Sequence, residues 1–367
     1  MRHRAVLLGL FAAVFLALAG SSSAGTSGSA VFVQTNEATG NQIAVYDRNS
    51  DGTLTRAGTY ATGGLGSAAL PGTESDRLAT QGSLVLVGHR LLIAVNAGSD
   101  TISVFAVRGD RLSLEQVLGS GGQFPAGVAV HGNLAYVLNA GGTGIVQGFR
   151  IGDHGLAPIS GSARPLGLAN GDPPFFLTSP GQVGFTPDGK QLIVTTKASG
   201  SLIDVFQVEP DGTLSAAPVA NPSATPVPFA FTFAHGRLVM GEAGASSLTT
   251  YAVRPDGTLT DPKSQSDGQA ALCWVTRVGP FFFVSNTGTS NISSFRLGAG
   301  GQPVLLSAVA ATTNPGTIDS AKSGRFLYVE TGTVGTVDEF RVESDGSLTP
   351  IGSATDLPPG IEGIAAA

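Results

Sequence analysis

Cysteine, charge and long apolar runs are all scarce in this chain. Cys273 is the only cysteine, so an intrachain disulfide is excluded. Charged residues make up 13% of the sequence, against about 25% in a typical globular protein, and the net charge of −6 includes no basic stripe. These features make nucleic acid a poor candidate partner. His and Cys pairs at metal-ligand spacing are missing as well, so we expect no metal site and no cofactor.

The first 24 residues have the pattern of an export signal. Arg2 and Arg4 give a basic start, Ala5–Ala19 is apolar, and small residues lead up to Ala24. The alternative, an uncleaved membrane anchor, is disfavoured because the run is short and no second span follows. We therefore expect a secreted, extracellular protein without stable membrane insertion. The predicted organisation is a signal peptide at 1–24, a short linker at 25–29 and one domain at 30–367.

What the chain has in abundance is glycine, with 52 residues, and a repeated strand pattern. Each of seven copies contains an apolar strand, a small polar turn and a second strand that ends in an aromatic residue. Repeats of about 40–50 residues that are built from strands are typical of a β-propeller, in which each repeat is one blade. The sequence therefore predicts an all-β, seven-bladed propeller with four-stranded antiparallel blades. The aromatic positions are Tyr46, Phe105, Phe149, Phe206, Tyr251, Phe295 and Phe340.

The two ends of the domain predict how the ring closes. The first repeat begins with the strand at 30–35 and has no inner strand before it, whereas the chain ends on an unpaired inner-type strand at 358–364. We infer that the C-terminal strand joins the first blade. This closure would protect strand edges that otherwise invite aggregation.

Blade geometry sorts the turns onto two faces of the ring. Turns from second to third strand, and the connectors between blades, lie together around the channel mouth. Two connectors, 62–81 and 160–182, are longer than the others, and we expect both on this face. They are interpreted as lids or partner contacts, or else as tolerated surface loops.

The second-to-third turns supply the candidate ligand-binding residues. Asn recurs at one place in four of the seven turns, and its alternative role is to bond its own turn backbone. Three blades carry a charged residue in this turn instead, which the repeat itself does not require. We predict ligand-binding residues at Asn36, Asn96, Asn139, Asn286 and Glu330, and catalytic candidates at Glu242, Lys197 and Arg164.

The segments Val95–Phe105 and Phe185–Lys190 resemble repeats of the YVTN type in the lactonase-type seven-bladed propellers. That family includes bacterial 6-phosphogluconolactonase and fungal carboxymuconate lactonizing enzyme. The resemblance covers residues 30 to 367 and implies the propeller fold and action on a lactone. It also implies that Glu242 is the family's catalytic Glu. The family's Gly-Pro-His and Ser-Asn-Arg-Gly-His motifs are replaced here by Ser179–Gln182 and Ser285–Thr289, so the family's His and Arg are absent.

Two functional hypotheses follow from these residues. In the first, Glu242 activates water while Lys197 or Arg164 stabilises the oxyanion, and a sugar lactone or similar small cyclic ester is hydrolysed. In the second, the propeller is catalytically silent and binds a small ligand or an extracellular protein. The candidate face has few cations, which disfavours a phosphorylated substrate on either hypothesis.

Overall fold

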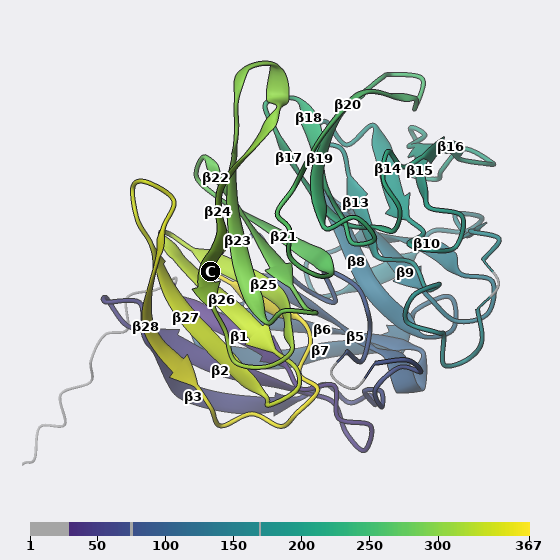
Figure 1. Cartoon of the computed structure of the whole chain (residues 1–367). Helices are drawn as coiled ribbons and strands as arrows, with labels where there is room; N and C mark the ends of the chain where they lie inside the picture. Colours follow the sequence, from purple (N-terminus) through teal and green to yellow (C-terminus); the bar gives the residue numbers. More distant parts are fainter. Residues whose placement is uncertain (1–28, 74–75, 169) are drawn as a thin grey trace, which may run out of the picture.

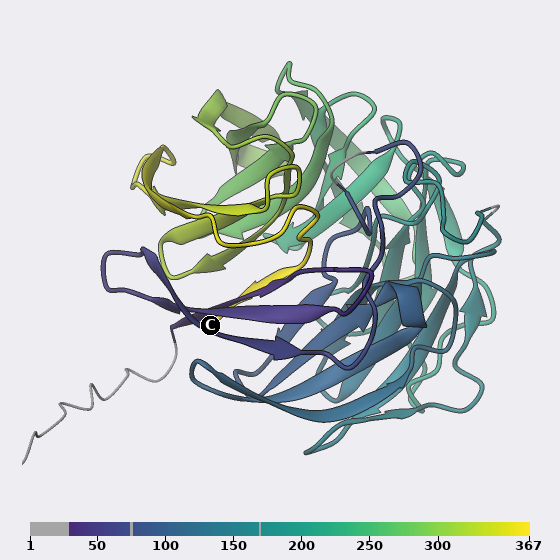
Figure 2. The same cartoon turned by 90° about the horizontal axis from the view of Figure 1, so that it is seen from below.

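The computed structural model describes residues 29–73, 76–168 and 170–367. Over these residues the chain forms seven antiparallel sheets arranged as blades around a central axis, as the sequence predicted (Figures 1 and 2). Six blades have four strands, and the third carries an additional short strand. The predicted signal peptide and most of the predicted linker lie outside the described residues. No helix in the described ranges is long and apolar enough to span a bilayer.

Each blade runs from an inner strand beside the axis to an outer strand at the rim. In that order, the first two blades contain β29 (Ile364–Ala366), β1 (Ala30–Gln34), β2 (Gln42–Arg48) and β3 (Leu54–Ala61); and β4 (Leu84–Val87), β5 (Leu91–Asn96), β6 (Thr101–Arg108) and β7 (Arg111–Gly119). The third blade contains β8 (Pro125–His131), β9 (Leu134–Asn139) and β10 (Ile145–Ile151), and both β11 (Leu156–Pro158) and β12 (Arg164–Pro165) pair with β10. The fourth and fifth contain β13 (Gln182–Phe185), β14 (Gln191–Thr195), β15 (Leu202–Gln207) and β16 (Val219–Pro222); and β17 (Pro228–Ala234), β18 (Arg237–Glu242), β19 (Ser247–Val253) and β20 (Leu259–Ser266). The last two contain β21 (Leu272–Val278), β22 (Phe281–Asn286), β23 (Asn291–Leu297) and β24 (Pro303–Thr312); and β25 (Thr317–Ser323), β26 (Phe326–Thr331), β27 (Thr336–Val342) and β28 (Leu348–Ala354). Two short 3-10 helices are η1 (Ala97–Ser99) and η2 (Ala299–Gly301).

The side-chain pattern of each strand follows its distance from the axis. The second strand of a blade is covered on both faces by neighbouring blades, so β5 is buried throughout and apolar up to its last residue. The outer strand β3 alternates between half-buried and exposed residues, because one of its faces meets solvent. All seven repeated aromatic residues are buried between blades. Burial of each such side chain stabilises the ring by roughly 1.5–3 kcal/mol.

The C-terminal strand closes the ring as predicted. In β29, Ile364 pairs with Val33 of β1 and Ala366 pairs with Val31. Figure 2 shows the yellow C-terminal strand beside the purple first strand. The regular strand includes only the last residue of the predicted 358–364 and continues to Ala366, while Glu362 and Gly363 still form backbone hydrogen bonds with Gln34 of β1.

Both long connectors lie on the face of the second-to-third turns, as predicted. In the first connector, Leu65 O accepts a hydrogen bond from Gly98 N in the turn of the second blade. In the second, Leu177 O accepts one from Ala198 N in the turn of the fourth blade. The connectors also meet each other, since Phe176 N donates to Pro71 O.

The end of the first connector enters the central channel. Thr80 O accepts a hydrogen bond from the Trp274 indole N–H at 3.1 Å. The Gln81 side chain spans to the sixth blade, where Oε1 accepts from Val275 N at 3.0 Å and Nε2 donates to Val275 O at 3.2 Å. On the other side, Gly181 O accepts from both Gln81 N and the Thr80 hydroxyl. The channel is therefore filled at this level, and the mouth above it has a floor.

Candidate functional site

A cavity of about 380 Å³ lies at the channel mouth, between the two connectors and the turns of the fourth, fifth and sixth blades. We call it the connector pocket. Its apolar wall includes Phe176, Leu177, Phe229 and Trp274, and its polar lining includes Asp76, Lys197 and Thr287. The Phe229 and Trp274 rings pack with centroids 4.7 Å apart. The pocket therefore combines a rigid aromatic wall with one buried cation and one carboxylate.

The close packing of the two connectors depends on Gly72, which lines the pocket. Its φ is +96°, and a Cβ atom there would lie 2.6 Å from Phe175 Cε2 and 2.7 Å from Phe176 Cε1. A side chain at this position would separate the connectors. Glycine is therefore required where the first connector passes beneath the two phenylalanines.

Lys197 ties the two connectors together. Its buried ammonium donates to Ala79 O of the first connector at 2.8 Å, and to Phe176 O and the Ser179 hydroxyl of the second. The same Nζ lies 4.9 Å from the centre of the Phe229 ring. Burial lowers the pKa of Lys197 to about 8, although the nearby Asp76 charge opposes this shift. Its three hydrogen bonds are all made to the protein itself.

Asp76 and Glu362 form a carboxyl pair at the floor of the pocket. Glu362 Oε2 accepts from the backbone N–H groups of Leu78 and Arg77, at 2.7 and 2.9 Å, and Oε1 accepts from Thr80 N at 3.2 Å. Burial, followed by the charge and hydrogen bond of Asp76, raises the pKa of Glu362 well above its usual range. The pair therefore favours the protonated form of Glu362. Through it, the segment that closes the ring also holds the first connector.

Glu330, a predicted ligand residue, lies below the pocket and does not line it. Its Oε2 accepts from Gly363 N at 2.9 Å in the ring-closing segment. Burial and the nearby Asp319 raise its pKa well above the usual range. Burial raises the pKa of Asp319 itself to about 7. Glu330 and Asp319 therefore place two buried carboxyl groups in the channel, and no cationic side chain of the described residues lies beside them.

Glu242 is fully buried and has its hydrogen-bonding capacity filled by four hydroxyl groups. Oε1 accepts from Ser223 at 2.6 Å and from Tyr251, while Oε2 accepts from Thr225 and Thr249, each at 2.5 Å. The adjacent residue Ala243 lines the connector pocket, but the Glu242 carboxylate belongs to this hydroxyl cluster.

Arg164 lies on the short strand β12 and bonds to backbone carbonyls. Its guanidinium donates to Ser215 O at 2.8 Å and to Leu214 O in the fourth blade, and to Gly161 O and Ala163 O, each at 2.8 Å, in its own connector. No hydrogen bond or ion pair of the described residues joins Arg164, Lys197 and Glu242. Of these three residues, the structure thus places only Lys197 at the pocket. The catalytic roles of Arg164 and Glu242 stay predictions.

The four predicted Asn residues are completely buried and hydrogen-bonded within the protein. Asn96 Nδ2 donates to the Thr101 and Ser103 hydroxyls, and Asn286 Nδ2 donates to Asn291 Oδ1 and the Ser293 hydroxyl. Both thus bond to the side chains five and seven positions later. Asn36 Nδ2 donates to Glu362 O at 2.5 Å, and Asn139 Nδ2 donates to Ser120 O at 3.3 Å. Glu242 bonds to Thr249, also seven positions later, so it occupies the same place in its blade.

Comparison with known proteins agrees with this architecture. The family model described as "Lactonase, 7-bladed beta-propeller" matches residues 258–361. This C-terminal part of the seven-bladed propeller is therefore similar to lactonases of that fold. No curated protein sequence matches it.

Solved structures that are similar to this seven-bladed propeller share its fold at low sequence identity. A protein from Lactobacillus plantarum has a TM-score of 0.71 at 18% identity, covering 93% of this chain and 100% of its own. A proposed 6-phosphogluconolactonase from Bacteroides fragilis has a TM-score of 0.70 at 17% identity, covering 95% and 100%. The periplasmic gluconolactonase of Pseudomonas aeruginosa has a TM-score of 0.70 at 17% identity, covering 93% and 99%.

Residue patterns alone did not assign the connector pocket of this propeller. Phe176, Phe229 and Trp274 read as ordinary apolar residues, and Asp76 and Glu362 are far apart in the sequence. The sequence feature that could have indicated the pocket was the length of the two connectors, because residues of both connectors line it. Which of their residues face inward depends on how they pack against each other.

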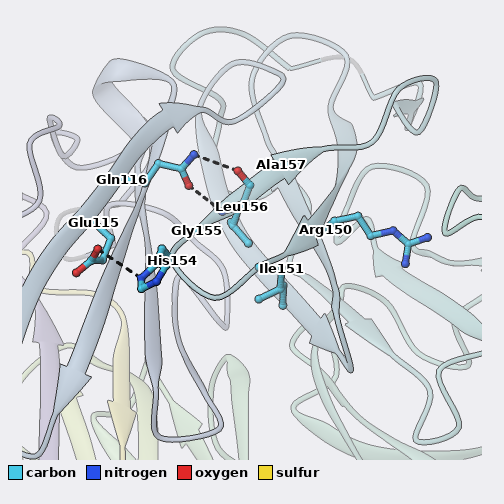
Figure 3. A pocket seen from close by; sticks show the side chains of 9 residues that line it. Glu115, Gln116, Arg150, Ile151, His154, Gly155, Leu156 and Ala157 are labelled. Atoms are coloured by element: carbon cyan, nitrogen blue, oxygen red, sulfur yellow. Dashed lines mark hydrogen bonds and ion pairs between the residues drawn. The ribbon is translucent and has the colours of Figure 1, made fainter.

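A second cavity of about 460 Å³ lies at the rim, between β7 and the turn from β10 to β11 (Figure 3). Gln116 crosses it and bonds to both backbone groups of Leu156, accepting from N at 2.7 Å and donating to O at 3.0 Å. Glu115 faces His154 with 3.9 Å between Oε2 and Nδ1, and the His154 side chain is 87% exposed. This groove joins two blades by a strand-like contact and is separate from the channel mouth.

Because carboxyl groups in the channel have raised pKa values, we expect the free energy of unfolding to fall as the pH rises toward neutral. Because the pKa of Asp319 is about 7 in the fold and about 4 in an unfolded chain, its protonated form stabilises the fold. That contribution is complete below pH 4 and is lost as the pH rises through 7, by roughly 1.4 kcal/mol per pH unit. We expect a higher Tm at pH 5 than at pH 7.5 by calorimetry. Asp319→Asn should reduce this difference, and an unchanged pH dependence in that variant would contradict the assignment.

Proposed function

We propose that this lactonase-type propeller is an exported protein that binds a small molecule of the lactone class in the connector pocket. The observation that carries the proposal is the pocket itself, which both connector insertions build over a filled channel. Pockets of this size with apolar walls and a few polar groups are typical small-molecule sites. A lactone as the ligand is supported by the family match and by the similar gluconolactonase.

Export is supported by the pattern of residues 1–24 and by the periplasmic location named for the similar Pseudomonas aeruginosa protein. The proposal includes no metal and no cofactor. Among the described residues, no cluster of three or more His, Cys, Asp or Glu side chains is arranged to hold a metal ion.

Hydrolysis of the bound lactone is the second candidate function. It is favoured by the Asp76 carboxylate and the Lys197 ammonium, which line one cavity. A carboxylate can activate water, and a nearby positive charge lowers the energy of the oxyanion that forms when water attacks the carbonyl carbon. Because the three donors of Lys197 are already used, its contribution is electrostatic. A propeller that binds the lactone without hydrolysing it is the alternative, since the hydrogen-bonding groups of Glu242 and Arg164 are also occupied by partners within the protein.

A substitution that fills the pocket with a larger side chain tests the binding proposal. With a panel of sugar and alkyl lactones, a bound ligand should raise the Tm of the wild type; saturation to 100 times Kd corresponds to about 2.7 kcal/mol. Ala243→Leu places three more carbon atoms in the pocket and should abolish the Tm shift. His154→Ala, at the rim groove, should leave it unchanged.

Ring opening is followed in parallel by titration of the acid that each lactone releases. A ligand-induced shift without acid release identifies a binding propeller, whereas acid release that Ala243→Leu abolishes identifies a hydrolase. A shift that persists in Ala243→Leu, or is lost in His154→Ala, would place the ligand elsewhere and contradict the proposal.

A further inference from the structure

We infer that the ligand of the connector pocket is an uncharged lactone with an alkyl or aryl substituent, and that a phosphorylated or bare sugar lactone does not fit this pocket. The inference rests on the proposed function and specifies its ligand class. It follows from three properties of the described residues: the aromatic wall, the state of the charged groups and the exposed apolar residues at the rim.

The wall offers an apolar group more contact than it offers a sugar. Phe176, Phe229 and Trp274 line one cavity together with Val227 and Leu177. The Trp274 N–H is already bonded to Thr80 O, so this indole presents only apolar surface to the pocket. Removing apolar ligand surface from water against such a wall favours binding.

The charged groups disfavour an anionic ligand. Lys197 is the one cationic side chain that lines the pocket in the described ranges, and its three N–H donors are bonded to Ala79, Phe176 and Ser179. A phosphate entering the pocket would have to take donors from the contacts that hold the connectors. It would also approach the Asp76 carboxylate, and like charges in a buried site repel strongly.

The lining also has too few polar side chains to form hydrogen bonds with all the hydroxyl groups of a sugar. Among the described residues, Thr73 and Thr287 are the hydroxyl-bearing side chains of the lining, whereas a gluconolactone brings four hydroxyl groups. Each ligand hydroxyl that is buried without a hydrogen-bond partner weakens binding. An alkyl or aryl substituent carries no such cost, so the pocket discriminates in its favour.

The rim extends the apolar surface toward solvent along the second connector. Leu177, which lines the pocket, is 36% exposed, and Phe175 beside it is 41% exposed. Phe175 packs against Phe176 with 5.2 Å between the ring centres. A substituent longer than the cavity would run along these side chains and cover them.

A homologous series of ligands tests this inference. We expect calorimetric titration with γ-lactones that carry zero to six side-chain carbons to show affinity rising roughly fourfold per methylene, and glucono-δ-lactone to bind more weakly than the hexyl member. Leu177→Asp should weaken binding of the hexyl lactone roughly tenfold by placing a charge against the chain, and it should weaken binding of unsubstituted γ-butyrolactone less. Leu114→Asp is the matched control, because Leu114 is a 42% exposed leucine on β7 of the second blade, and it should change neither affinity.

The outcomes separate the inference from the function on which it rests. Tight binding of glucono-δ-lactone with no chain-length dependence would uphold a lactone pocket and overturn the apolar ligand class. Equal binding of the alkyl lactones and the matching alkyl cyclopentanones would uphold an apolar pocket and overturn the lactone as ligand. An equal loss of affinity for the hexyl lactone in Leu177→Asp and Leu114→Asp would overturn the proposal that the substituent runs along the exposed apolar side chains at the rim.

Discussion

Deleting residues 358–367 is expected to abolish cooperative folding of the propeller. The deletion removes Ile361 and Ile364, which are buried in the cluster between the first and last blades. It also removes the pairing of β29 with β1 and leaves β1 with an open edge at the centre of the ring. The loss of two buried isoleucines alone is worth about 4–8 kcal/mol, which is comparable to the roughly 5–15 kcal/mol by which folded domains are usually stable.

Thermal and chemical unfolding, followed by circular dichroism, measure this effect. Ile364→Ala gives a graded version of the same change and should cost about 2–4 kcal/mol. Ile351→Ala, in the outer strand β28 where the side chain is only half-buried, serves as the matched control and should cost less. A deletion variant that unfolds cooperatively near the wild-type Tm would show that ring closure is not needed for stability.

Glu242→Gln is expected to destabilise the fold by about 2–3 kcal/mol while leaving the ligand affinity of the folded protein unchanged. The carboxylate accepts hydrogen bonds from four hydroxyl groups, on Ser223, Thr225, Thr249 and Tyr251. Glutamine keeps one oxygen acceptor and replaces the other with an N–H₂ donor, so hydroxyls on one side face a donor in a buried site. Bonds to charged groups contribute about 1.5–3 kcal/mol, and buried unpaired groups cost as much again.

The same variant tests the catalytic role that the sequence predicted for Glu242. If the carboxylate were the base that activates water, hydrolysis per folded molecule would fall by roughly 100-fold or more while the Tm stayed close to that of the wild type. Glu343→Gln is the control for loss of a carboxylate at the surface. Its ion pair with Arg341 is about one-third exposed on both sides, so its loss should change the stability far less than the loss of the Glu242 carboxylate.

The sequence predicted the blades accurately because each blade is specified locally. In the fourth blade the sequence pattern predicts strands at 182–186, 191–195 and 202–208, and the structure has strands at Gln182–Phe185, Gln191–Thr195 and Leu202–Gln207. The signals are the alternation of apolar residues, the aromatic anchors and turns with the sequence Asp-Gly, and all act within about ten residues of each other. The sequence pattern places the outer strand directly after the turn at Asp211–Gly212, whereas the observed strand begins several residues later, at Val219. Outer strands bury little apolar surface, and their pattern is correspondingly weak.

The predicted turn residues show why the site was harder to predict. Asn96, Glu242 and Asn286 stand at matching positions, and the sequence cannot tell an exposed ligand-binding side chain from one that bonds to the next strand. The structure shows that all three are fully buried with protein partners. Lys197, predicted on the same grounds, lines the pocket because the connectors supply its acceptors and cover it.

The number of blades, the closure of the ring by its last strand and the face on which the connectors lie could all be predicted from the amino-acid sequence. These features follow from periodic burial and turn chemistry, which repeat along the chain. Three further features became visible in the folded protein alone: the first connector fills the channel, Asp76 contacts Glu362, and Lys197 joins the two connectors. Those contacts link residues more than a hundred positions apart, or depend on the packing of irregular loops, and no periodic pattern specifies them.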